Sequence, residues 1–210
     1  MIGIFGGTFD PVHFGHLRAA SEALEALPLA NLRLLPAGQP PHRSLTFAPA
    51  EHRLAMLELA LQNQPDLIAD DREVRRTGHS FMVDTLRVFR EQAGNSPLLL
   101  LIGQDAANKL DTWHQWQRLF ELAHIVIMRR PDSKHVYSGQ LFREVQPRLV
   151  SDVQALGETC SGRVLPLEVT QLAISSTRIR SLIAAGRTAR FLLPEPVIRY
   201  IDEKGLYRED

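Results

Sequence analysis

The chain opens with Met1-Ile2-Gly3-Ile4-Phe5, followed directly by Gly6-Gly7-Thr8-Phe9-Asp10-Pro11-Val12-His13-Phe14-Gly15-His16. The first five residues have the length and apolar content of a buried strand. After Gly15, leucine and alanine recur at helical spacing, which predicts a helix that ends near Pro28. A strand that turns sharply into a helix directs the free backbone N–H groups of the helix, and the positive end of its dipole, into the gap between them.

The residues in this gap suit a phosphate group. Gly6 and Gly7 have no Cβ atom, so a ligand can approach the main chain closely. His13 and His16 stand three residues apart at the predicted start of the helix, where they can contact an anion. The loop lacks both the Gly-Lys-Ser/Thr ending of a Walker-type phosphate loop and the Gly-x-Gly-x-x-Gly pattern of dinucleotide-binding folds.

A metal site is the alternative for the two histidines. Zinc normally takes three or four protein ligands, and Asp10 is the single further ligand nearby in the sequence. The sequence therefore offers few candidate ligands for a zinc ion, and we expect no metal held by protein side chains.

Composition narrows the function classes. The chain has 210 residues, with 24 Lys and Arg against 24 Asp and Glu. A net charge of zero argues against general binding to nucleic acid or to a membrane surface. The lone Cys160 fits a reducing compartment, and no apolar run reaches the length of a membrane span. With no secretion signal visible at the start, we expect a cytoplasmic protein.

Predicted strands and helices alternate along most of the chain. Strands are expected at 31–36, 67–69, 97–102, 124–128 and 164–169, with helices between them. This order predicts an α/β fold: a Rossmann-like, doubly wound, mostly parallel sheet with helices on both faces and a small C-terminal helical portion. We expect one domain over residues 1–210, with the sheet and its helices in about 1–170 and the C-terminal helices in about 171–210. Loops after three strands, at Gly6, Ala37 and Gly103, should converge on one crevice.

A second informative stretch is Ile174-Ser175-Ser176-Thr177-Arg178-Ile179-Arg180. A serine or threonine before a helical pattern is typical of an N-cap, which can be purely structural. Two arginines in the same first turn oppose the helix dipole at a cost of about 0.3–1 kcal/mol each. A bound polyphosphate removes this conflict, because arginine binds phosphate oxygens through two parallel hydrogen bonds.

These two motifs together resemble the nucleotidyltransferase superfamily with the His-x-Gly-His signature. The chain is most similar to the bacterial nicotinate-nucleotide adenylyltransferases. The similarity extends through Arg76-Thr77-Gly78-His79-Ser80, Asp84-Thr85-Leu86, Gly103-Gln104-Asp105, Thr112-Trp113, Arg129-Arg130-Pro131 and Leu193-Pro194-Glu195-Pro196. The resemblance implies that the phosphate of nicotinate mononucleotide attacks the α-phosphorus of ATP, giving nicotinate adenine dinucleotide and pyrophosphate without a covalent enzyme intermediate.

The resemblance also implies roles for single residues. His16 would donate to the α-phosphate as charge develops, His13 would hold the phosphate region, and Arg180 would bind the departing pyrophosphate. Mg²⁺ would bridge phosphate oxygens with few protein ligands. The remaining implied ATP-binding residues are Gly6, Gly7, Thr8, Gly103, Asp105, Arg129, Ser176 and Thr177.

On the acceptor side, the resemblance places the pyridine ring against Trp113 and its carboxylate at backbone amides near Thr85 and His114. Arg43 would extend toward the phosphates, although the family often has lysine at that position. Without the resemblance, Trp113 would be expected to pack in the core. Trp116 is expected in the core, and Arg72, Arg75 and Arg76 on a solvated face.

Two rival functions remain open. One is an adenylyltransferase for another acceptor, such as nicotinamide mononucleotide or phosphopantetheine; the phosphopantetheine family usually lacks a histidine at the position of His13. The other is a nucleotide-binding sensor that has the fold without the catalysis, which the intact His13, His16 and Arg180 disfavour. The oligomeric state is not indicated by the sequence.

Overall fold

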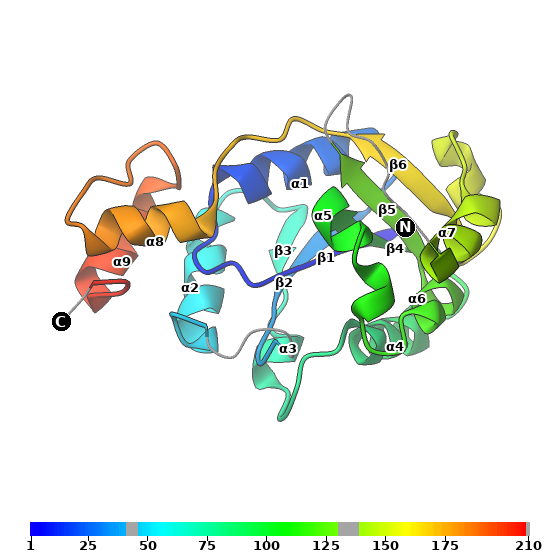
Figure 1. Cartoon of the computed structure of the whole chain (residues 1–210), viewed down its shortest axis with the longest axis horizontal. Helices are drawn as coiled ribbons and strands as arrows, with labels where there is room; N and C mark the ends of the chain where they lie inside the picture. The colour runs from blue at the N-terminus through cyan, green and yellow to red at the C-terminus, as the bar shows by residue number, and fades with distance from the viewer. Residues whose placement is uncertain (41–45, 130–138, 209–210) are drawn as a thin grey trace.

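A parallel β-sheet forms the centre of the computed structural model, which describes residues 1–40, 46–129 and 139–208 (Figure 1). Within these residues the sheet has six strands in the order β3-β2-β1-β4-β5-β6, and every neighbouring pair is parallel. The strands are β1 (Ile2–Gly7), β2 (Asn31–Pro36), β3 (Leu67–Ala69), β4 (Leu98–Gly103), β5 (His124–Arg129) and β6 (Val164–Glu168). The predicted doubly wound α/β sheet is confirmed, and it is parallel throughout.

The strand order places the ligand crevice between β1 and β4. The chain moves outward from β1 to β3 and then crosses back to β4. The two central strands β1 and β4 therefore mark the point where the winding direction changes. Ligands of such sheets bind beyond the carboxyl ends of the strands at this point. β1 ends at Gly7 and β4 at Gly103, which puts both predicted loops at the crevice.

The central strands bury side chains on both faces of the sheet. In β4, Leu99 and Leu101 pack into one hydrophobic cluster, whereas Leu98, Leu100 and Ile102 pack into the other. This alternation follows from the two-residue period of a strand. The continuous apolar run of β4 is therefore a consequence of its position between two layers of helices.

Helices cover the two faces in separate groups. α1 (Phe14–Ala26), α2 (Ala50–Ala60), α8 (Ser176–Ala184) and α9 (Glu195–Lys204) contribute to the first cluster. α4 (Met82–Ala93), α6 (Gln117–Leu122) and α7 (Gly139–Val145) contribute to the second. The short elements are α3 (Arg72–Arg75), α5 (Gln104–Ala107), and the 3-10 turns η1 (Leu110–Thr112), η2 (Gln146–Arg148) and η3 (Val153–Gly157).

The local sequence is misleading at two positions. Ser80 has the residue type of an N-cap, but Phe81 occupies the cap position of α4, and the Ser80 hydroxyl accepts hydrogen bonds from the amides of Gly38 (2.9 Å) and Gln39 (3.2 Å). Arg72 does not belong to a solvated face, because it pairs with Asp70 at 2.7 Å. Ser80 is engaged by amides about 40 residues earlier in the chain, whereas Arg72 is engaged by a carboxylate only two residues away.

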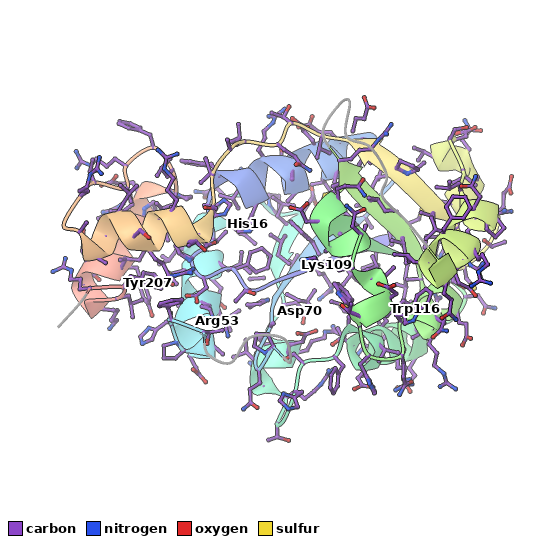
Figure 2. The ribbon with its side chains drawn as sticks, viewed as in Figure 1. His16, Arg53, Asp70, Lys109, Trp116 and Tyr207 are labelled. Carbon is purple, nitrogen blue, oxygen red and sulfur yellow. The ribbon has the colours of Figure 1, made fainter. Side chains whose placement is uncertain are left out.

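A buried polar cluster joins the N-terminal motif to the C-terminal end of the chain. The carboxylate of Asp10 accepts hydrogen bonds from the amides of Phe47 (2.8 Å) and Ala48 (3.2 Å) and from the hydroxyl of Tyr207 (2.7 Å). The fully buried Arg53 donates to the carbonyl of Thr8 at 2.8 Å. Figure 2 shows Arg53 on α2 and Tyr207 beyond the end of α9. The cluster therefore connects four segments next to the crevice.

Candidate active site

The N-terminal ends of α1 and α8 meet at the crevice (Figure 1). The amide of Phe14 donates to the carbonyl of Leu192 at 3.0 Å, and the hydroxyl of Ser176 donates to the carbonyl of Pro11 at 3.0 Å. Neither helix has an acidic residue in its first turn. Two uncompensated positive dipole ends therefore lie side by side, as an anion site requires.

The two histidines of the N-terminal motif form a stacked pair. The ring centroids of His13 and His16 are 3.7 Å apart with an interplanar angle of 24°, and the rings of Phe9 and His16 meet in a T-shaped arrangement with centroids 5.0 Å apart. A Cβ atom on Gly15 would lie 3.0 Å from the ring of His13. Glycine at this position therefore leaves the space that the His13 ring occupies. Figure 2 shows His16 near the start of α1, facing the crevice.

Burial keeps both histidines neutral near ~pH 7. Burial lowers the pKa of His13 from 6.5 to about 4, and this effect outweighs that of a backbone hydrogen bond, which raises the pKa. Burial also lowers the pKa of His16 well below its ordinary value, and the charge of His13 lowers it further. The Nδ1 atoms of both rings are buried, and neither has a hydrogen-bond partner among the described residues. A neutral imidazole can still donate one N–H bond to a phosphate oxygen.

The pKa of His13 predicts a loss of stability in mild acid. The unfolded chain takes up a proton below pH 6.5, whereas the folded chain resists it down to about pH 4, so acid favours unfolding. The free energy of unfolding should fall by about 2 kcal/mol from this residue alone between ~pH 7 and ~pH 5. Urea unfolding of the unsubstituted protein and of His13→Asn at both pH values measures this fall in the free energy of unfolding. An equal fall in the two proteins would contradict the prediction.

The second motif is capped as predicted. Ser175 is the N-cap of α8, and its hydroxyl accepts from the amide of Arg178 at 3.2 Å. The guanidinium of Arg180 donates to the carbonyl of Asp10 at 2.6 Å and to the hydroxyl of Thr177 at 3.3 Å. The ring of Phe47 lies over the guanidinium, with its centroid 4.0 Å away. Arg180 is thus fixed between the two motifs.

Both motifs line one cavity of about 580 Å³, which we call the nucleotide cavity. A Cβ atom on Gly103 would meet nothing within 4 Å, so this glycine opens directly onto free space. Arg180 lines a smaller neighbouring cavity. Thr177 lines both this smaller cavity and the nucleotide cavity. The predicted residues that line the nucleotide cavity are Thr8, His13, His16, Gly103, Asp105, Ser176 and Thr177.

A second cavity of about 370 Å³, the acceptor cavity, adjoins the first. Thr8 and Ala106 line both cavities, so the two spaces meet at the end of β1. Trp113 and His114 line the acceptor cavity, and their contact with the acceptor stays a prediction. Gly6 and Gly7, which we expected at ATP, line this second cavity instead. Trp116 is buried in the core, as expected.

Among the described residues, Arg129 and Thr85 were predicted to bind substrate but line neither cavity. Arg129 pairs with Glu168 at 2.9 Å. Thr85 is fully buried, with its amide bonded to the carbonyl of Phe81. Arg43 lies outside the described residues. The implied roles of these three residues in ligand binding stay predictions.

Sequence reasoning missed several residues of the site. Asp10 was considered as a metal ligand, but its carboxylate bonds to two amides and a tyrosine. Glu73 lines the acceptor cavity although it stands in a charged segment that was expected to be solvated. The position of Asp10 inside the N-terminal motif could have indicated that its side chain belongs to the site. No pattern in the sequence indicates Glu73 or Tyr207.

In the part of the chain that the structure describes, no group of three His, Cys, Asp or Glu side chains is placed to hold a metal ion. In the same residues, no helix is long and apolar enough to cross a membrane.

Comparison with known families decides the relationship. The sequence model of the cytidylyltransferase-like family matches residues 4–182, which include both motifs. The chain belongs to this family. A family member from Methylococcus capsulatus is 50% identical over 208 residues, covering 99% of each chain, and one from Acidithiobacillus ferrooxidans is 45% identical over 206 residues, covering 98% of this chain and 94% of the relative. Both relatives are named probable nicotinate-nucleotide adenylyltransferase.

Solved structures agree on the fold of this family member. The nicotinic acid mononucleotide adenylyltransferase of Plasmodium falciparum, complexed with NaAD, superposes with a TM-score of 0.75 at 17% identity, covering 98% of this chain and 96% of that one. The same protein complexed with APC gives 0.72 with equal coverage. At this identity the similarity establishes the shared fold.

Proposed function

We propose that this chain transfers the adenylyl group of ATP to nicotinate mononucleotide, giving nicotinate adenine dinucleotide and pyrophosphate for NAD biosynthesis. The observation that carries the proposal is the junction of the two cavities at Thr8 and Ala106. One cavity has two helix N-termini and a histidine pair for a polyphosphate, and the other has an indole ring for a planar heterocycle. Full-length relatives at 45–50% identity are named for this reaction.

The chemistry follows from position and charge. ATP in the nucleotide cavity places its α-phosphorus near His16, and the acceptor phosphate enters past Thr8. The acceptor oxygen bonds to the α-phosphorus while the bond to the pyrophosphate oxygen breaks, and the electron pair leaves with pyrophosphate. Such a transfer needs mainly alignment and stabilisation of the charge that develops on the equatorial oxygens.

Three donors would stabilise that charge. His16 donates from one face of the α-phosphate, and its neighbour His13 holds the ring in place through their stacked contact. Thr177 and Arg180 lie at the other helix, where the β- and γ-phosphates would leave. The bound anions also oppose the effect of burial on the pKa of both histidines and strengthen the donation. Mg²⁺ would complete the charge balance, held by phosphate oxygens with few protein ligands.

Product analysis tests the proposal. The protein with ATP, Mg²⁺ and nicotinate mononucleotide should release nicotinate adenine dinucleotide and pyrophosphate in equal amounts, detected by mass spectrometry and by a coupled pyrophosphate assay. Reactions with nicotinamide mononucleotide or phosphopantetheine in place of the acid should run with lower catalytic efficiency. Product from phosphopantetheine alone would overturn the acceptor assignment, and ATP binding without any product would favour the sensor.

A further inference from the structure

A carboxylic acid lines the cavity that is proposed to receive a carboxylate. Of the described residues around the acceptor cavity, Glu73 is the one acid, and it is 3% exposed. A negative charge at this wall repels the acid form of the acceptor and leaves the neutral amide form unaffected. The proposed substrate preference therefore needs a compensating charge.

Arg76 provides a charge of the required sign through a hydrogen-bonded chain. The hydroxyl of Thr85 donates to Oε1 of Glu73 at 2.7 Å and accepts from Nη1 of Arg76 at 3.1 Å. The hydroxyl of the fully buried Thr85 is thereby oriented by one partner at each end. We call these three residues the Glu73–Thr85–Arg76 chain.

Other charges around Glu73 are already engaged. The carboxylate of Asp70 is paired with Arg72 (2.7 Å) and Arg33 (3.0 Å). The adjacent Arg75 points to solvent, 80% exposed, and pairs with Asp71 one helical turn away. Burial raises the pKa of Glu73, and Arg76 opposes this increase. Arg76 is thus the cation joined to Glu73 through Thr85.

We propose that Arg76 and Glu73 determine the preference for the acid acceptor over the amide, and that the Thr85 hydroxyl links their side chains through hydrogen bonds. Arg76 offsets the charge of Glu73, so a second carboxylate can bind nearby. The inference rests on the proposed function. It predicts opposite effects of two neutralising substitutions, because one removes the positive member of the chain and the other removes the negative member.

The quantity to measure is the ratio of kcat/KM for nicotinate mononucleotide to kcat/KM for nicotinamide mononucleotide. At ~pH 8, Arg76→Gln should lower the ratio about tenfold. Glu73→Gln should raise the ratio severalfold, and the double variant should return it to within about threefold of its original value. Arg76→Lys keeps the charge and should keep the ratio even if both efficiencies fall.

The matched control is Arg75→Gln, which removes an exposed arginine one position away and should leave the ratio unchanged. Thermal unfolding checks that each variant is folded. Equal losses with both acceptors in Arg76→Gln and in Glu73→Gln would show a merely structural role and overturn the inference. Failure of the unsubstituted protein to use either pyridine mononucleotide would overturn the proposed function instead, so the two failures are distinguishable.

Discussion

Replacing His16 with alanine should lower turnover by at least about two orders of magnitude, the usual effect of losing one donor to a transition-state oxygen. His16 lines the nucleotide cavity and stacks on His13, and in the proposed reaction its N–H donates to the α-phosphate. ATP affinity should change little, because we expect most ground-state contacts to the polyphosphate from the helix N-termini and Arg180. Steady-state pyrophosphate release and ATP titration measure the two quantities separately.

A histidine outside the site provides the control. His79 is exposed and lines neither cavity, so His79→Ala should retain normal turnover. Near-normal pyrophosphate release by His16→Ala would discard the assignment of His16 as the α-phosphate donor. A large loss of ATP affinity with unchanged turnover would assign it to ground-state binding instead.

Replacing Asp10 with asparagine should lower the free energy of unfolding by about 3 kcal/mol. The Asp10 carboxylate is 1% exposed and accepts from donors on both oxygens. An asparagine must present its NH₂ group to one of these donors, which leaves a buried donor without a partner. Guanidinium or urea unfolding followed by circular dichroism measures the difference.

Two companion variants define the size of this effect. Tyr207→Phe removes one of the three donors to Asp10 and should cost about 1 kcal/mol. Asp71→Asn breaks a surface ion pair with Arg75 and should stay within about 0.5 kcal/mol of the unsubstituted protein. Equal stability of Asp10→Asn and Asp71→Asn would contradict the conclusion that the hydrogen bonds to Asp10 stabilise the fold.

Strands of the sheet were predictable because they are apolar runs with clear ends. β2 and β3 have the predicted bounds, and β4 begins and ends one residue later than the predicted range. The cap of α4 was not predictable in the same way. Ser80 has the right residue type for a cap, but its hydroxyl binds amides about 40 residues earlier in the chain. Local propensity cannot identify a partner that the tertiary fold supplies.

The phosphate motifs were predictable because their chemistry is local. Strand-turn-helix geometry and two histidines define the first motif, and a capping serine with arginines defines the second. The Asp10–Tyr207 bond joins residues 197 positions apart, and nothing in either segment indicates the other. The arginines at 72, 75 and 76 look alike in sequence, yet Arg75 alone is solvated as expected.

Stereochemistry at the α-phosphorus tests most directly whether the adenylyl group is transferred directly, within one site between two helix N-termini. One diastereomer of ATP carrying sulfur on the α-phosphorus is used with nicotinate mononucleotide, and the configuration of the dinucleotide product is determined. A single in-line attack predicts inversion. Retention would mean two successive displacements through a covalent enzyme intermediate and would contradict the account.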